Sequence, residues 1–505
     1  MSGTSITRRE MIRTMGGLAL AGQLGAAFAA EGGKKPNIVY IMTDDHAAHA
    51  LSCYGSKINK TPNLDRIANE GMRFTNCFVT NSLCGPSRAA ILTGKYSHIN
   101  GVLDNGAHQR FDGSQPTFPK LLQKAGYKTG IVGKWHLVTD PTGFNYWNIL
   151  PGQGIYNNPV LIEMGEKKKH EGYVTDIITD LAIDFVKKSK DQPFCLLYHH
   201  KAPHRGWEPD AKHADMYKDV QMPDPATFKD DYVGRSSAMA EAEMRVADMP
   251  DYVGKGLPPN LPLDERRQWN YQRFIKDYCR CVASVDDNVG RMLDYLQSAG
   301  LADNTIVIYT ADNGFFLADH GWFDKRFMYE ESLRVPFLVR YPQEIKPGTV
   351  NDRIILNVDY APTLLDCAGV PIPGDIQGRS IRPLLRGERP KDWRTSMYYH
   401  YYEYPAAHRA RPQYGVRTEE HKLIHYYTIN EWELFDLKKD PREMKNVYSD
   451  PAYAAVVGKM KSELARLRAD LKDTSEIIEE APKEPPKKQP AKKQGTKGKK
   501  AKKAA

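Results

Sequence analysis

The amino-acid sequence predicts an α/β protein in which a large, mostly parallel sheet lies between layers of helices, with a small antiparallel subdomain after it. Three observations predict this class. Short β-branched runs alternate with longer amphipathic stretches, as in successive βα units. Several short runs are apolar throughout, which is typical of strands that both faces of a parallel sheet bury. From about residue 391 onward, tyrosine-rich strand-like runs precede a single helical stretch at 451–471, which indicates an antiparallel sheet packed with one helix.

Four of the strand-like runs end at side chains that can carry charge or bind a metal. The runs span residues 37–42, 129–132, 194–198 and 305–309. The side chains of this kind that follow them are Asp44, Asp45, His46, Lys134, His136, His199, His200, Lys201, His204, Asp312 and Asn313. Open α/β sheets bind ligands at the carboxyl ends of their strands, so we expect these four segments to converge on one site. Any one of them alone is compatible with a solvated turn.

Helical segments separate these strands. The patterns cover residues 63–70, 85–92, 172–188 and 268–299. Cys84 is expected to cap the second of these helices. The interval 211–263 is rich in Asp, Met, Pro and Gly and is expected to form an irregular insertion that shapes access to the site.

The chain divides into four parts by composition. We expect a catalytic domain over residues 31–385, a C-terminal subdomain over 386–478 and a disordered Lys/Pro-rich tail over 479–505. Residues 1–30 combine paired arginines, a Gly/Ala-rich apolar run and a small-x-small cleavage site, and they resemble a twin-arginine export signal. A membrane anchor is the alternative, but the run is short and Gly-rich for a bilayer span. Export implies the twin-arginine machinery as a partner and a periplasmic, extracellular or cell-surface location.

Charge and cysteine content exclude several functional classes. The formal net charge is +9, but ten lysines lie beyond residue 482, and the body of the chain is close to neutral. We therefore expect no nucleic-acid partner. Beyond the first thirty residues no stretch is long and apolar enough for a stable membrane span. The seven cysteines show none of the zinc-site spacings, and their positions leave disulfide pairing open.

A twelve-residue motif begins at Cys84. Residues 84–88 read Cys-Gly-Pro-Ser-Arg, and residues 89–95 continue as Ala-Ala-Ile-Leu-Thr-Gly-Lys. The cysteine, the proline two residues later, the arginine four residues later and the Leu-Thr-Gly after them resemble the signature of type I sulfatases in the alkaline phosphatase superfamily. A buried cysteine at a helix start is the plainer alternative. The resemblance implies an alkaline phosphatase/sulfatase-like fold, oxidation of Cys84 to formylglycine by a maturation enzyme, and hydrolysis of sulfate esters.

Oxygen ligands for a metal follow two of the predicted strands. Asp44, Asp45, Asp312 and Asn313 offer carboxylate and amide oxygens, which suit Ca²⁺ or Mg²⁺ rather than zinc. The resemblance covers these four positions and adds one oxygen of the modified Cys84 to the ligand set. An exposed acidic turn together with an Asn-Gly turn is the alternative. We expect Ca²⁺, with Mg²⁺ as the other choice.

The same resemblance assigns roles to basic side chains. Arg88 would steady the formylglycine and the metal ligands, while Lys134 and Lys325 would bind the sulfate oxygens. His136 would accept a proton from the second hydroxyl of the hydrated aldehyde, and His204, with Lys325, would protonate the departing alcohol. Taken singly, such lysines are usually solvated and such histidines are usually structural.

The reaction that the resemblance implies is covalent. One hydroxyl of the hydrated aldehyde attacks sulfur, the sugar alcohol leaves, and the sulfated diol collapses by C–O cleavage to regenerate the aldehyde. An unmodified thiol cannot take the second step, so activity is expected to depend on maturation.

Further segments are similar to those of bacterial N-acetylglucosamine-6-O-sulfatases. They are residues 143–147, 150–154, 398–405, 414–418 and 422–425. Their aromatic, His and Arg side chains suit packing on a sugar ring and hydrogen bonding to its hydroxyls, and His400, Glu403 and His408 are candidate substrate-binding residues. The expected substrate is a sulfated oligosaccharide or polysaccharide, with 6-O-sulfated N-acetylglucosamine or glucosamine units favoured. A tyrosine-rich edge of the small sheet would explain the same runs without a ligand.

Three other functions stay open at this point. One is a different carbohydrate sulfatase specificity. Another is a phosphodiesterase or phosphonate monoester hydrolase of the same superfamily, which could use a similar metal site. The third is a non-catalytic glycan-binding relative, which should have lost a ligand or the nucleophile, whereas every expected position is filled here.

Overall fold

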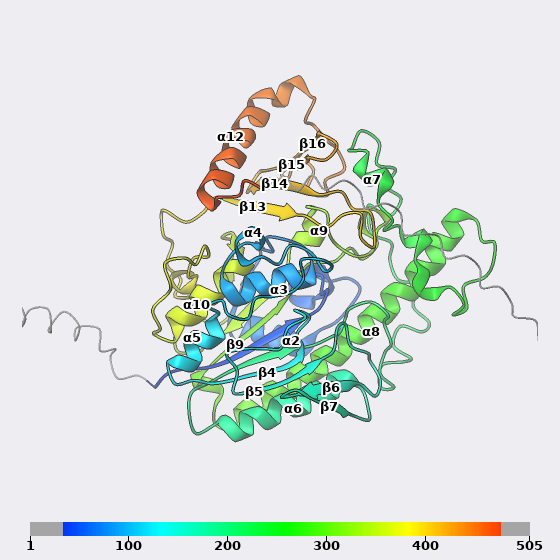
Figure 1. The fold of residues 1–505 in the computed structure, drawn as a ribbon. Coiled ribbons are helices and arrows are strands. Elements are labelled where there is room, and N and C mark those ends of the chain that lie inside the picture. The colour runs from blue at the N-terminus through cyan, green and yellow to red at the C-terminus, as the bar shows by residue number, and fades with distance from the viewer. Residues whose placement is uncertain (1–33, 476–505) are drawn as a thin grey trace, which may run out of the picture.

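A computed structural model describes residues 34–475 and confirms the α/β class (Figure 1). The expected export signal and the expected tail lie outside these residues. In spatial order the main sheet contains β11 (Thr349–Asn351), β2 (Met72–Phe74), β10 (Phe337–Arg340), β9 (Thr305–Ala311), β1 (Asn37–Thr43), β8 (Phe194–His199), β4 (Lys128–Lys134), β5 (Tyr146–Leu150), β6 (Val160–Glu163) and β7 (Glu166–Lys169). The five strands β9, β1, β8, β4 and β5 run parallel, and antiparallel pairs appear toward both edges.

The central strand β1 shows why the sheet needs helices on both faces. All seven of its residues are buried. Because side chains alternate along a strand, Ile38, Tyr40 and Met42 enter one hydrophobic core while Val39 and Ile41 enter the other. The helices of the first core are α3 (Cys84–Thr93), α5 (Phe118–Lys124) and α10 (Tyr360–Cys367). Those of the second are α2 (Pro62–Asn69), α6 (Val174–Ser189) and α8 (Leu263–Ser298), and Figure 1 shows the two layers on opposite sides of the sheet.

The C-terminal subdomain forms the expected antiparallel sheet with one helix. Its strands are β13 (Ser396–Tyr401), β14 (Gln413–Thr418), β15 (His421–Tyr426) and β16 (Glu431–Asp436), and its helix is α12 (Ala454–Leu471). The ring of Trp432 stacks on His425 at 3.8 Å, and the ammonium of Lys461 in α12 lies 4.4 Å from the same indole. The subdomain is continuous with the core that contains α3, so its position relative to the main sheet is fixed by apolar packing.

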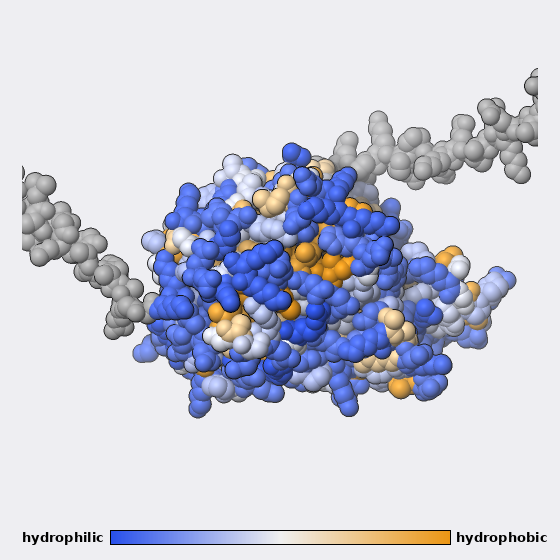
Figure 2. Space-filling model, turned by 90° about the horizontal axis from the view of Figure 1, so that it is seen from below, coloured by the Kyte–Doolittle hydropathy of each residue, from blue (hydrophilic) through white to orange (hydrophobic). Residues whose placement is uncertain are grey.

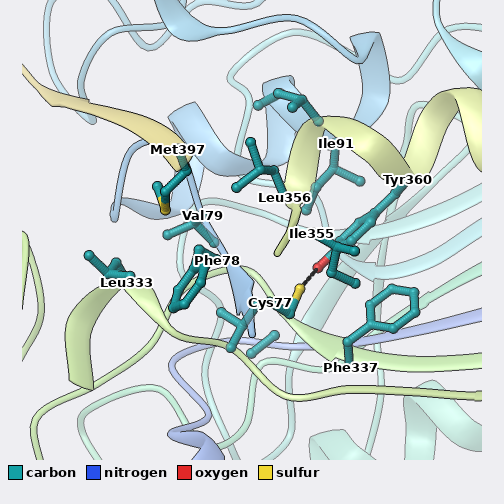
Figure 3. Packing of buried hydrophobic residues seen from close by; sticks show 14 of the residues in the cluster. Cys77, Phe78, Val79, Ile91, Leu333, Phe337, Ile355, Leu356, Tyr360 and Met397 are labelled. Carbon is teal, nitrogen blue, oxygen red and sulfur yellow. Dashed lines mark hydrogen bonds between the residues drawn. The ribbon is translucent and has the colours of Figure 1, made fainter. Parts of the chain in front are cut away.

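Figure 3 shows the packing that supports α3. The short strand β3 (Cys77–Phe78) pairs with β12 (Ile355–Leu356), and Sγ of Cys77 lies 2.9 Å from the hydroxyl of Tyr360. Ile91 reaches this cluster from α3, and Met397 reaches it from β13. Side chains from β3, β12, α10 and β13 therefore pack in one hydrophobic cluster against α3, the helix that carries Cys84.

The insertion expected over 211–263 consists mainly of turns, with the short helix α7 (Ala238–Glu241). It joins the rest of the molecule through backbone hydrogen bonds from Phe323 to Met244, at 2.9 Å, and from Glu243 to His408, at 2.8 Å. The remaining short helices are α4 (Ser97–Asn100), α9 (Glu330–Leu333) and α11 (Arg382–Leu385). Within residues 34–475 no helix combines the length and apolarity that a bilayer crossing requires.

The face of the molecule that Figure 2 shows is mostly hydrophilic.

Candidate active site

Cys84 is the first residue of α3, and Leu83 before it has the extended backbone of a cap position. We had expected Cys84 to cap the helix. Instead, Leu83 is the cap residue and Cys84 is the first residue of the helix. All ten residues of α3 are buried, and the amide of Gly85 donates to Oδ1 of Asn105 at 2.9 Å. The free amides of a helix N-terminus favour negative charge beside them. Burial is the main influence that raises the pKa of the Cys84 thiol above its usual value.

Three carboxylates converge on Cys84 from two neighbouring strands. Asp44 and Asp45 follow β1, Asp312 follows β9, and the last pair in the register of these strands is Thr43 with Ala311. One potential ligand atom from each aspartate and the sulfur of Cys84 all lie within 4.8 Å of one another, and all four residues are fully buried. The strand-end prediction thus brings together residues that are more than 260 positions apart.

Asn313 completes the same group. Its Nδ2 donates to Oδ1 of Asp45 at 2.6 Å, while its Oδ1 is buried and has no hydrogen-bond partner among residues 34–475. A buried amide oxygen without a donor costs free energy unless a ligand uses it. With three carboxylates beside it, this donor set fits a hard divalent cation.

Three buried cations face the carboxylates. Arg88 donates from Nε to Asp312 at 3.0 Å, from Nη2 to Asp44 at 3.4 Å, and from Nη1 to the backbone oxygen of Lys134 at 2.7 Å. The ammonium of Lys134 pairs with Asp44, and that of Lys325 donates to both oxygens of Asp45, at 2.7 and 2.8 Å. Each of the three cations thus has a carboxylate partner, which is the condition under which buried charges are tolerated.

The two histidines of the predicted site flank this group. His204 places Nε2 3.8 Å from Oδ2 of Asp45, and its Nδ1 lies 3.3 Å from the backbone oxygen of Arg205. His136 follows β4, and its Nδ1 has no hydrogen-bond partner in the described part of the chain. Burial first, and then the nearby Lys134 ammonium, lower the pKa of both imidazoles below the usual value. Both rings are therefore neutral.

Strained backbone gathers at the same place. Asp45, His136, Asp324 and Arg326 are not glycine, yet each has a positive φ, at 64°, 56°, 76° and 91°. Such conformations are costly for residues with a Cβ, and they persist where the surrounding structure enforces them, often at functional sites.

The segment around Lys325 supplies polar groups that the sequence did not single out. Arg326 donates from Nη1 to Oη of Tyr401 at 3.0 Å and pairs with Glu403, whose Oε1 accepts from the amide of Asn105 at 3.2 Å. Because Asn105 also accepts from Gly85, this chain of hydrogen bonds connects the C-terminal subdomain to the start of α3.

On the other side of Lys325, Asp324 faces the predicted residue His408. Nε2 of His408 lies 3.1 Å from Oδ2 of Asp324 and 3.2 Å from Nη1 of Arg205. Arg205 in turn pairs with Asp251 of the insertion at 2.7 Å. Two of the three residues proposed to contact the sugar ring, Glu403 and His408, are thus beside the Lys325 segment.

The third, His400, is not. Its Nδ1 lies 2.8 Å from Asp473 and its Nε2 lies 3.4 Å from Oη of Tyr427, on the face of β13 that packs toward the end of α12. The side chain is 2% exposed and its contacts lie within the C-terminal subdomain. The side-chain contacts of His400 thus lie away from the Lys325 segment, and its role in substrate binding stays a prediction.

Gln153 is a further group at the site without a predicted role. It lies in the exposed loop after β5, yet its Oε1 accepts a hydrogen bond from the fully buried ammonium of Lys134. The sequence pointed to residues 150–154 only through their similarity to segments of known sulfatases. Nothing in their composition predicted that the Gln153 amide would contact the buried Lys134.

Comparison with known proteins places the fold and site in a family. The family model described as Sulfatase matches residues 36–370, and that described as N-sulphoglucosamine sulphohydrolase, C-terminal, matches residues 318–470. An N-acetylglucosamine-6-O-sulfatase of Bacteroides thetaiotaomicron is 48% identical over 83% of this chain and 84% of its own length. A human N-acetylglucosamine-6-sulfatase is 30% identical over 76% of this chain and 70% of its own length.

Among solved structures, a protein in complex with its substrate D-glucosamine-2-N,6-O-disulfate superposes with a TM-score of 0.83 at 45% sequence identity. The match covers 88% of this chain and 99% of that one. The chain belongs to the sulfatase family and is a sulfuric ester hydrolase, and this family implies a formylglycine and a metal ion at the active site.

Proposed function

We propose that the protein removes the 6-O-sulfate from N-acetylglucosamine or glucosamine units of sulfated glycans. The observation that carries this proposal is the extent of the similarity. The solved relative with a glucosamine disulfate substrate matches 88% of the chain, so the match takes in both the main sheet and most of the C-terminal subdomain. Arg326 and Asp324, which flank Lys325, pair with Glu403 and His408 of the C-terminal subdomain, and we place the sugar beside these pairs.

We assign Cys84 as the position of the formylglycine and Asp44, Asp45, Asp312 and Asn313 as the residues that would hold the metal. The formylglycine supplies a hydroxyl nucleophile toward sulfur, and the metal withdraws charge from the sulfate oxygens. Arg88, with contacts to Asp44 and Asp312, fixes the orientation of two of the carboxylates. Ca²⁺ suits this site because it accepts irregular sets of oxygen ligands, whereas Mg²⁺ demands near-octahedral geometry.

The remaining charged side chains bind sulfate and transfer protons. Lys134 pairs with Asp44 and Lys325 pairs with Asp45, so both ammonium groups lie beside the carboxylates near Cys84, where an anion would enter. His136 is neutral and accepts the proton of the second diol hydroxyl. The departing alcohol oxygen takes its proton from the ammonium of Lys325, with His204, 3.8 Å from Asp45, beside it.

Sugar recognition falls to the hydrogen-bond network on either side of Lys325. Arg326 and Glu403 form one pair, and Asp324 and His408 form the other. A site whose buried polar groups pair with substrate hydroxyls rejects sugars that leave those groups unpaired, which is an efficient basis for selecting one sugar isomer. These four residues are therefore the proposed determinants of the glucosamine specificity.

The proposed setting is outside the cytoplasm. The twin-arginine-like signal of residues 1–30 supports export to the periplasm or cell surface, and a formylglycine-generating enzyme is the required maturation partner. Cell fractionation of the full chain and of an Arg8→Lys, Arg9→Lys variant tests this location. Export that persists in the variant argues against the twin-arginine route.

A desulfation screen on defined sugars tests the function. Purified, matured enzyme is incubated with N-acetylglucosamine 6-sulfate, glucosamine 2-N,6-O-disulfate, a galactose 6-sulfate, a 2-O-sulfated uronic acid and a phosphodiester. We expect release of sulfate from the two 6-sulfated glucosamines and at least 100-fold lower turnover of the others. A Cys84→Ala variant is the control for contaminating activity. Preference for the phosphodiester, or for another sulfated sugar, contradicts the proposal.

A further inference from the structure

Lys201 lies at the edge of the site and has no role in the reaction described above. It follows β8, and its backbone oxygen accepts from the amide of His204 at 3.1 Å. The next residue, Ala202, accepts from the amide of Asp44 at 3.4 Å, so this turn is attached directly to the loop that carries two of the proposed metal ligands. The backbone of Lys201 is therefore held next to the loop that carries Asp44 and Asp45.

The ammonium of Lys201 has no acidic partner. The residue is only 4% exposed, yet within residues 34–475 no hydrogen bond or ion pair reaches its Nζ. Its one close polar contact is the ring of Tyr156, whose centroid is 4.7 Å away and whose hydroxyl donates to the backbone oxygen of His204 at 2.6 Å. The Nζ atom is not among the fully enclosed polar atoms, so part of its surface is open to a ligand.

The charge balance of the site makes this unpaired lysine significant. Three carboxylates, from Asp44, Asp45 and Asp312, are matched by the three cations already paired with them. Lys201 adds a fourth positive charge without an acid to match it. Lys201 is close enough to His204 to affect its ionisation. The pKa of the His204 imidazole is lowered first by burial and then by the charges of Lys134 and Lys201.

Retaining such a lysine costs stability. Burial is the main influence that lowers the pKa of Lys201 from its usual value to about 8, which shows that the folded protein disfavours the charge. A buried side chain that destabilises the fold and whose donors are free is typical of a binding group. Because Lys201 gives the otherwise balanced site a net positive charge, the ligand it would favour is an anion.

We infer that Lys201 is a substrate-binding residue that donates to a sulfate group of the sulfated glycan. This inference rests on the proposed function only in taking a sulfated sugar as the substrate. A sulfated sugar carries at least one monoanionic group, and a disulfated glucosamine carries two, so the ligand can be the scissile sulfate or a second one.

A Lys201→Met variant tests the inference, because methionine fills a similar volume without the charge. Lys187→Met is the matched control, since Lys187 also lies over a tyrosine ring, that of Tyr295 at 5.5 Å, but on the exposed face of α6. We expect Lys201→Met to lower kcat/KM at least tenfold, mainly through KM, while its unfolding midpoint stays equal to or above that of the parent enzyme. Lys201→Arg should recover part of the loss. An unchanged kcat/KM, or a loss of stability that parallels the loss of activity, overturns the inference.

Binding of inorganic sulfate separates this inference from the identity of the sugar. Sulfate that binds the folded enzyme raises its unfolding temperature in proportion to its affinity. We expect Lys201→Met to require at least tenfold more sulfate for the same rise, whichever sugar the enzyme desulfates. Equal protection of variant and parent by sulfate contradicts a direct contact. If the loss in kcat/KM is larger on glucosamine 2-N,6-O-disulfate than on the 6-sulfate, Lys201 binds the second sulfate, and an equal loss assigns it to the scissile one.

Discussion

Lys325 donates to both carboxylate oxygens of Asp45, at 2.7 and 2.8 Å, although the two residues are 280 positions apart in the sequence. Both side chains are almost completely enclosed, with exposures of 3% and 0%. This ion pair connects the loop after β1 with the segment that also presents Asp324 and Arg326, so it couples the metal group to the proposed sugar site.

Replacement of Lys325 by Met leaves the Asp45 carboxylate buried without its partner. Loss of one member of a buried pair destabilises a protein by about 3–5 kcal/mol, and we expect a loss of this order in metal-depleted enzyme. Urea denaturation measures it. Added Ca²⁺ should recover part of the loss because it supplies positive charge beside Asp45. The exposed pair of Lys188 with Asp184 provides the control, and Lys188→Met should leave the midpoint unchanged. Equal midpoints for the Lys325 variant and the parent would show that Asp45 is not an ionised partner.

Chelation of the metal should lower both activity and stability. Without a cation, the three carboxylates near Cys84 repel one another and Asn313 keeps an unsatisfied oxygen. We expect EDTA to lower the unfolding temperature and Ca²⁺ to restore it, and we expect Asn313→Leu to need at least tenfold more Ca²⁺ for the same rise. Asn288→Leu removes a buried amide in α8, away from this group, and should leave the Ca²⁺ requirement unchanged. A stability that is independent of Ca²⁺ in the parent enzyme contradicts the metal site.

A negative charge at position 153 should impair substrate binding. Gln153 accepts from the ammonium of Lys134, so Gln153→Glu adds a carboxylate where a sulfate has to approach. We expect KM to rise at least tenfold in steady-state assays, while Gln153→Asn, which stays neutral, changes it less. Equal KM values for the two variants would place Gln153 outside the path of the sulfate.

His200 should make stability fall in mild acid. Burial lowers the pKa of His200 from its usual value near 6.5 to about 3, and neither ring nitrogen has a hydrogen-bond partner in the described part of the chain. Between these two pKa values the unfolded chain binds a proton at this residue and the folded chain does not, so stability decreases as the pH falls. The contribution amounts to about 3 kcal/mol between pH 7 and pH 4.

His200→Phe removes that contribution and retains the ring contact with Tyr198, whose centroid is 4.4 Å away. Urea denaturation of parent and variant at pH 7 and pH 5 measures the difference. We expect the variant to lose less stability than the parent over this interval. Identical losses would mean that His200 already carries a proton in the folded protein.

The core of the site was predictable because strand ends in a parallel sheet share one edge. Asp44, Asp45, Asp312 and Asn313 follow β1 and β9, which are adjacent, so reading where each apolar run stops was enough to group them. Lys134 was grouped by the same strand-end pattern, whereas Arg88 and Cys84 came from the resemblance of residues 84–95 to a known signature.

The sugar-side residues could not be read in the same way. Asp324 and Arg326 reach their partners because both have positive φ values, and residue type alone does not reveal that conformation. The strand β13 shows a second reason. Tyr399 and Tyr401 contact Arg326, whereas His400 faces Asp473, and a period of two residues indicates which positions share a face but not which face meets the site.

Peptide mass analysis at position 84, combined with sulfate release by the same sample, tests the central claim most directly. We expect protein that is co-expressed with a formylglycine-generating enzyme to carry formylglycine at position 84, and the rate of desulfation of N-acetylglucosamine 6-sulfate to rise in proportion to the modified fraction. Full activity in a sample whose residue 84 is entirely unmodified cysteine would contradict it.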